Sequence, residues 1–194
     1  MRNKNLIHKL FSSLQGGFTL IELIVAFTVI AILSVVGVAS FADYSKSQTI
    51  LADRQKLISV LNTAKANASS QLKETTDCPT SSNPLLNEAL NGYLITIDDD
   101  KNYTLYIECI NTSSLITNQS QISTYKLSKN IDFDLTANPS THVVKIFYPL
   151  FSGKAVLYSD TIGEGTVLTS PGTITLTGND KTSTITIDQT GIIR

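Results

Sequence analysis

The feature that most constrains this chain of 194 residues is an unbroken apolar stretch near its N-terminus. From Phe18 to Phe41 the sequence reads FTLIELIVAFTVIAILSVVGVASF, with one charged residue, Glu22, and no proline. As a helix rising about 1.5 Å per residue, it would extend about 36 Å, enough to cross a hydrocarbon layer about 30 Å thick. A helix in a soluble core rarely stays apolar on every face for this long. The stretch therefore predicts a membrane span.

The residues before this stretch predict its orientation. Residues 1–17, MRNKNLIHKLFSSLQGG, carry three basic residues and no acid, and basic residues beside a span favour the cytoplasmic side. We expect a single-pass protein with its N-terminus in the cytoplasm and its C-terminal part outside. In a secretory signal peptide the apolar region precedes the cleavage site and is removed. Here Gly16 and Gly17 precede the apolar region, so cleavage there would leave the apolar helix on the mature protein.

The junction sequence QGGFTLIELIVA resembles the N-terminal motif of the type IV prepilin and pseudopilin superfamily. The resemblance rests on Gly17, Phe18 and the residues up to Glu22, which read G-FTLIE. It implies that a membrane-embedded prepilin peptidase cleaves the Gly17–Phe18 bond and then methylates the new amino group of Phe18. It also implies a structural subunit and not an enzyme. The implied partners are other pilin or pseudopilin subunits, the peptidase and an inner-membrane assembly platform.

Glu22 is the one acid in the apolar stretch, and a carboxylate there needs a partner. On insertion scales it costs about 2.5–3.5 kcal/mol at the centre of a span. Cleavage creates a positive amine at Phe18, one helical turn away. The resemblance implies that the amine of a neighbouring subunit pairs with Glu22 during filament assembly. In the unassembled monomer the carboxyl group can instead be protonated.

Beyond Phe41 the apolar residues become periodic. They recur at helical steps of seven, four, three, four and four, at Ile50, Leu57, Leu61, Ala64, Ala68 and Leu72. Asp53 and Lys56, three residues apart, are expected to pair on the solvent-facing side. We predict one helix over residues 18–72 whose second half packs on a globular head. The alternative use of this stripe is contact with a partner protein.

After Lys73 the sequence changes to short runs typical of β-strands. Residues 75–84, TTDCPTSSNP, are expected to form the loop that ends the helix. The β-type runs follow at residues 93–97, 103–110, 122–127, 143–147, 155–158, 173–177 and 184–188. Residues 98–102 and 178–181 lie between consecutive runs and predict hairpin turns. The expected fold is α+β and pilin-like, with a long N-terminal helix packed on an antiparallel β-sheet head.

The chain is thus expected to have four parts: a cleaved leader (1–17), a membrane and assembly helix (18–41), its amphipathic continuation (42–73) and a β head (74–194). The net charge of −1 is a composite. Without the leader, twelve basic side chains face sixteen acidic ones, a net charge of −4. This balance argues against nucleic-acid binding through bulk electrostatics.

Both cysteines, Cys78 and Cys109, fall in the outward-facing head. An oxidising compartment would permit a disulfide that closes a loop of about thirty residues and contributes about 3–4 kcal/mol. The alternative is two unpaired buried thiols. Their spacing, without clustered histidines, makes a zinc site improbable.

No catalytic constellation is evident, and we expect no cofactor and no metal. His142 is the one histidine beyond the leader, and no serine or cysteine motif surrounds it. A lone histidine beside a strand is most often structural. The run Asp98 to Asp100 offers carboxylates to calcium but lacks the spacing of an EF-hand loop, so a solvated turn is favoured.

The C-terminal stretch, residues 163–194, looks like the H-type minor pseudopilins of type II secretion, whose relatives include a minor pilin used in DNA uptake. The expected function is therefore a minor subunit of a type II secretion pseudopilus or a type IV pilus. The alternative is a filament-tip module that captures DNA or a secreted substrate. Lys181 and Arg194 are the candidate DNA contacts, although Asp180 and Asp188 stand near them and make DNA binding doubtful.

Overall fold

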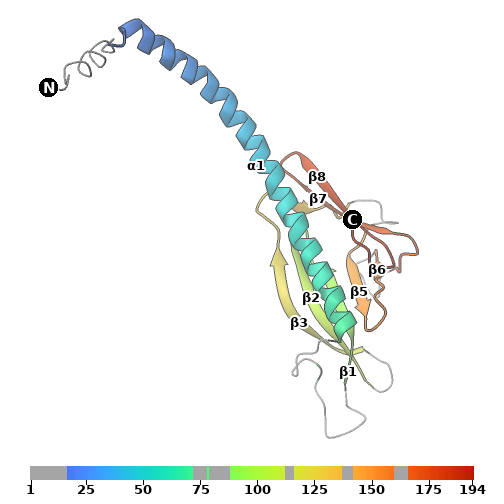
Figure 1. The fold of residues 1–194 in the computed structure, drawn as a ribbon. Helices are drawn as coiled ribbons and strands as arrows, with labels where there is room; N and C mark the ends of the chain where they lie inside the picture. The colour runs from blue at the N-terminus through green and yellow to red at the C-terminus, as the bar shows by residue number, and fades with distance from the viewer. Residues whose placement is uncertain (1–16, 72–77, 79–87, 112–115, 137–141, 160–165) are drawn as a thin grey trace, which may run out of the picture. The chain divides into compact units, whose positions relative to one another are not determined.

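The computed structural model describes residues 17–71, 78, 88–111, 116–136, 142–159 and 166–194 (Figure 1). Residues 1–16, Leu72 and all of the predicted loop at 75–84 except Cys78 lie outside the described residues. The chain divides into two compact units, residues 1–45 and 46–194, which we describe separately.

The first unit contains the beginning of helix α1 (Leu20–Ser70). The large apolar side chains between residues 18 and 41 whose burial is described are all exposed, with exposed fractions of 48–79%. Within the residues that the structure describes, no helix is long and apolar enough to cross a membrane. The span expected at residues 18–41 therefore lacks support from the described helix.

The second unit contains the rest of α1 and two antiparallel sheets (Figure 1). The five-stranded sheet has the order β3-β2-β1-β5-β6, with β1 (Ala89–Ile97), β2 (Asn102–Ile110), β3 (Ile116–Lys126), β5 (Lys145–Pro149) and β6 (Val156–Tyr158). The three-stranded sheet has the order β4-β7-β8, with β4 (Asp132–Phe133), β7 (Gly172–Gly178) and β8 (Lys181–Ile187). The α+β architecture predicted from the sequence is confirmed.

Each of the seven predicted β-runs overlaps a strand, although the bounds differ by up to six residues, and the two predicted hairpin turns connect β1 to β2 and β7 to β8. The sequence did not predict β4, because two residues are too short to show an alternating pattern. It also did not predict that the strands divide into two sheets.

The core of the second unit is one cluster of buried side chains from α1 and from both sheets. The predicted helical stripe supplies the contribution of α1, with Ile50, Leu57, Leu61, Ala64 and Ala68 each at most 3% exposed. β2 contributes every second residue from Tyr103 to Cys109, all buried. The stripe is therefore a core surface of this chain, as expected.

The predicted pairing of Asp53 with Lys56 is wrong. Asp53 is buried, with 6% of its surface exposed, and accepts hydrogen bonds from the backbone N–H of Ser128 (2.8 Å) and from its hydroxyl group (3.2 Å). The Nζ of Lys56 instead donates to the carbonyl oxygen of Lys126 (3.3 Å). The reason is geometric: residue 53 lies three positions after Ile50 and four before Leu57, which places it on the buried stripe.

Two further basic side chains of α1 donate hydrogen bonds to the backbone of the C-terminal region. The Nζ of Lys65 donates to the carbonyl oxygen of Gly191 (2.9 Å), and the Nε of Arg54 donates to that of Thr184 on β8 (3.5 Å). Together with Asp53, these contacts join the second half of α1 to the loop between β3 and β4, to β8 and to the residues that follow β8.

Candidate processing and assembly site

The junction predicted to be cleaved lies just outside helix α1. Gly17 is exposed, residues 17–19 have no regular secondary structure, and α1 begins at Leu20. A side chain added at Gly17 would meet no atom within 4 Å. The Gly17–Phe18 bond therefore offers backbone groups that no helical hydrogen bond occupies, as a peptidase requires.

Thr19 caps the N-terminus of α1. Its Oγ1 accepts a hydrogen bond from the backbone N–H of Glu22 (3.3 Å), and its carbonyl oxygen accepts one from the N–H of Leu23 (3.2 Å). Thr-Leu-Ile-Glu has the spacing of a capping box, in which a threonine is followed three residues later by a glutamate. This capping role was not among the sequence-based predictions, although the spacing of Thr19 and Glu22 is visible in the sequence.

Glu22 lies in the first turn of α1, close to Phe18 along the chain, and it is exposed. The unpaired N–H groups of a helix start favour a negative charge there. Exposed apolar side chains surround it on α1, including Leu20, Ile21 and Leu23. This surface offers one carboxylate within an apolar setting.

In the head, Cys78 and Cys109 form a disulfide with their Cα atoms 5.7 Å apart. Both are fully buried. The bond ties the chain that follows α1 to the end of β2, so the predicted pairing is confirmed and the alternative of two free thiols is wrong.

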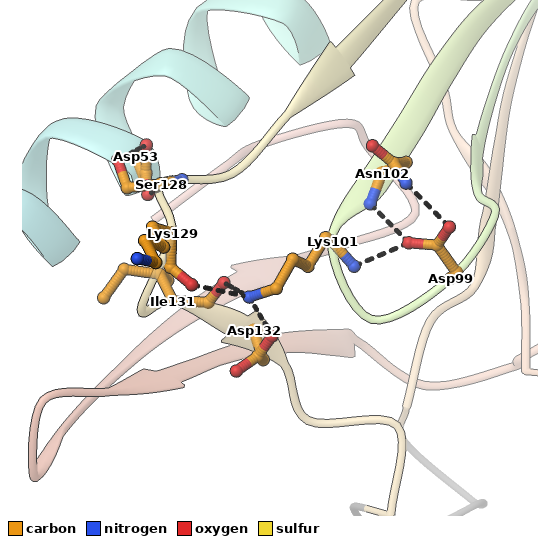
Figure 2. A network of polar contacts seen from close by, with 8 residues as sticks. All are labelled: Asp53, Asp99, Lys101, Asn102, Ser128, Lys129, Ile131 and Asp132. Carbon is orange, nitrogen blue, oxygen red and sulfur yellow. Dashed lines mark hydrogen bonds and ion pairs between the residues drawn. The ribbon is translucent and has the colours of Figure 1, made fainter.

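The aspartate run forms a hydrogen-bonded turn between β1 and β2 (Figure 2). One carboxylate oxygen of Asp99 accepts the backbone N–H groups of Lys101 and Asn102, and the other accepts the side-chain amide of Asn102, all at 2.7 Å. These bonds, with the Asn102 side chain first, lower the pKa of Asp99. Asp98 accepts the hydroxyl of Thr104. Donors of the chain itself therefore engage two of the three carboxylates.

Lys101 connects this turn to the strand β4 (Figure 2). Its Nζ donates to the carbonyl oxygens of Lys129 (3.0 Å) and Ile131 (3.1 Å) and to the carboxylate of Asp132 (2.5 Å). Asp53 holds Ser128 in the same loop from the side of α1. The loop between β3 and β4 is thus held from both sides, which shapes the head but provides no catalytic group.

The two candidate DNA contacts do not come together. Lys181 lies at the hairpin between β7 and β8, whereas Arg194 pairs with Thr186 near the other end of β8 through two backbone hydrogen bonds of 3.0 Å. Five residues of strand separate these positions by about 17 Å. The pKa of Asp188 is lowered chiefly by the hydrogen bonds that it accepts from the Thr190 hydroxyl and from the backbone N–H of Ile192, and the positive charge of Arg194 adds a smaller effect. The structure thus assembles no continuous basic surface from these residues.

Residues 12–38 match the family model described as the prokaryotic N-terminal methylation motif. The match spans the end of the leader, the Gly17–Phe18 junction and the first turns of α1. No curated protein and no solved structure matches the chain. This motif supports the class of proteins that are processed and methylated at their N-terminus. The chain carries the N-terminal signature of the type IV prepilin and pseudopilin superfamily, which supports a prepilin-like precursor of a pilin or pseudopilin.

Proposed function

We propose that this chain is cleaved between Gly17 and Phe18, is anchored in the inner membrane by the first half of α1, and then enters an extracytoplasmic filament as a minor subunit. The observation that carries the proposal is the exposed junction, matched to the methylation motif and followed directly by an apolar helix start. Apolar side chains exposed to this degree are expected to contact lipid before assembly and the corresponding helices of other subunits after assembly.

Glu22 has a defined part in this proposal. Once the leader is removed, Phe18 carries a positive amine directly before the cap residue Thr19. When the subunit leaves the membrane and packs against other subunits, the amine of a neighbouring Phe18 pairs with the carboxylate of Glu22. This pairing is favoured because an unpaired charge among apolar helices is costly. An inner-membrane platform and other pilin or pseudopilin subunits are the proposed partners.

Within the superfamily we assign the chain to the minor subunits of a type II secretion pseudopilus. The support is the resemblance of residues 163–194 to H-type pseudopilins. In this chain the described residues of that stretch form the β7–β8 hairpin, and the C-terminal residues fold back on β8. Deleting the gene should reduce secretion of exoproteins while leaving surface pili intact. Loss of pili with normal secretion would place the subunit in a type IV pilus instead.

The first test is processing. Co-expression of the full chain with a prepilin peptidase should remove residues 1–17 and add one methyl group to Phe18, both seen by intact mass. Gly17→Ile is a matched control, because the chain has open space at this position, so the substitution leaves folding unaffected and blocks only the peptidase. An unprocessed wild-type chain would refute the proposed function.

The second test is assembly. Glu22→Leu should stay in the membrane fraction and be processed, but its incorporation into filaments should fall at least tenfold. Asp100→Asn, which removes an exposed acid of the head, is the control and should assemble normally. Wild-type incorporation of Glu22→Leu would contradict the pairing of Glu22 with a neighbouring amine.

A further inference from the structure

His142 begins a junction segment (residues 142–144) that connects the two sheets. On one side, residue 142 forms a bridge with Thr173 of β7, and the N–H of Val143 donates to the carbonyl oxygen of Thr173 (3.0 Å). On the other side, the N–H of Val144 donates to the carbonyl oxygen of Tyr158 on β6 (2.9 Å) and its carbonyl oxygen accepts an N–H of β1 (2.8 Å). The segment thus shares backbone hydrogen bonds with both sheets.

The imidazole of His142 is buried without a hydrogen bond. His142 has only 3% of its surface exposed, and neither Nδ1 nor Nε2 of its ring has a hydrogen-bond partner among the described residues. A neutral ring tolerates this position at moderate cost, whereas an unpaired charged ring does not. Burial therefore lowers the pKa of His142 from its ordinary value of 6.5.

The charged groups around the ring do not compensate for this burial. The negative charge of Asp134, which follows β4, raises the pKa of His142, but this effect is weaker than the lowering by burial. The carboxylate of Asp134 already accepts two hydrogen bonds from Thr136. β7 reads GTITLTG and carries no titratable side chain. Asp132 on β4 is paired with Lys101.

We propose that His142 makes the junction between the two sheets acid-sensitive: the uncharged ring holds residues 142–144 in place, and its protonation releases β7 and β8 from the five-stranded sheet. The packing between the junction segment and β7 is tight. A methyl group added at Gly172, next to Thr173, would collide with Val143. A protonated ring therefore leaves the interior instead of acquiring solvent where it lies.

The direction of the pH effect follows from proton linkage. Above pH 6.5 the ring is neutral in the closed and in the released states, and pH has no effect through this group. Below pH 6.5 the released state binds a proton that the closed state does not. The equilibrium constant for release then rises by up to about tenfold per pH unit, until the pKa of the closed state is reached.

The experiment uses the full chain in detergent micelles with its disulfide intact and with His8→Gln, so that His142 is the single histidine. A proton NMR titration of the ring should give a midpoint below 6.5. Hydrogen exchange between pH 7.5 and 5.5 should show amides of β7 and β8 losing protection before those of β1 and β2. His142→Phe should remove this pH dependence.

A midpoint at or above 6.5 would overturn the inference, and so would a His142→Phe variant with the pH dependence of the parent. Equal loss of protection in both sheets would show general acid unfolding and no role for the junction segment. If His142→Phe does not fold, His142→Gln provides an uncharged polar side chain for the same hydrogen-exchange comparison. The NMR titration of the His142 ring in the parent chain requires no variant. None of these results depends on cleavage or filament assembly.

Discussion

Replacing Asp53 with alanine should destabilise the head strongly, although aspartates on the surface of a helix are usually replaceable. Asp53 is 6% exposed and accepts two hydrogen bonds from Ser128, which lies 75 residues away in the chain. These bonds hold the loop between β3 and β4 against α1. Alanine removes both acceptors and leaves the backbone N–H of Ser128 without its partner.

The expected cost follows from the kind of bond that is lost. A hydrogen bond to a charged group is worth about 1.5–3 kcal/mol, and a buried donor left unpaired costs about 1–3 kcal/mol. These two effects overlap, so we expect Asp53→Ala to lower the free energy of unfolding by about 3 kcal/mol. Asp53→Asn keeps one oxygen for the N–H of Ser128 and should cost about half as much. The surface pair with Lys56 that the spacing suggested would be worth only about 0.2–0.5 kcal/mol.

The assay is urea denaturation of the oxidised chain in mild detergent, followed by circular dichroism. Lys56→Ala is the matched control on the same helix and should cost under about 1 kcal/mol, because its ammonium group donates to a single carbonyl oxygen at the surface. If Asp53→Ala costs no more than Lys56→Ala, the buried bond to Ser128 does not hold this loop and the reasoning fails.

Three further predictions test other parts of the head. Cys109→Ser, which opens the loop closed with Cys78, should lower stability by about 3 kcal/mol, and reductant should lower the melting temperature of the parent but not of the variant. Gly92→Ala should cost about 1–3 kcal/mol in denaturation, since its methyl group would collide with the carbonyl oxygen of Tyr148; an unchanged midpoint would contradict this packing. The hydrogen bonds that Asp99 accepts lower the pKa of its carboxyl group, so they stabilise the β1–β2 turn above pH 3.8, and this stabilisation is lost as pH falls through the pKa of the folded state. An NMR titration of Asp99 should have its midpoint below pH 3.8. A higher midpoint would show that these hydrogen bonds do not form.

Much of the fold could be read from local patterns. The helical spacing of Ile50, Leu57 and Leu61 identified the buried face of α1, because one helix face recurs every three to four residues whatever it packs against. Alternation identified β7 and β8 for the same kind of reason. The N-terminal motif was also local: Gly17, Phe18 and Glu22 lie within six residues, and the matched methylation motif contains them all.

What only the tertiary structure decided depends on contacts between distant parts of the chain. The helical spacing that identified Ile50 and Leu57 as buried also places Asp53 between them on the same face. A buried carboxylate costs free energy unless it is hydrogen-bonded, and here the backbone N–H of Ser128, from a distant part of the chain, donates to it. The division of the strands into two sheets, the separation of Lys181 from Arg194 and the burial of His142 between the sheets have no counterpart in any short window of sequence. The sequence by itself thus determined which N-terminal motif this protein carries and which surfaces of its head it must bury. Which polar groups meet in the head was decided by strand pairing, because hydrogen bonds need partners at a fixed distance, whereas apolar burial needs only a surface to cover.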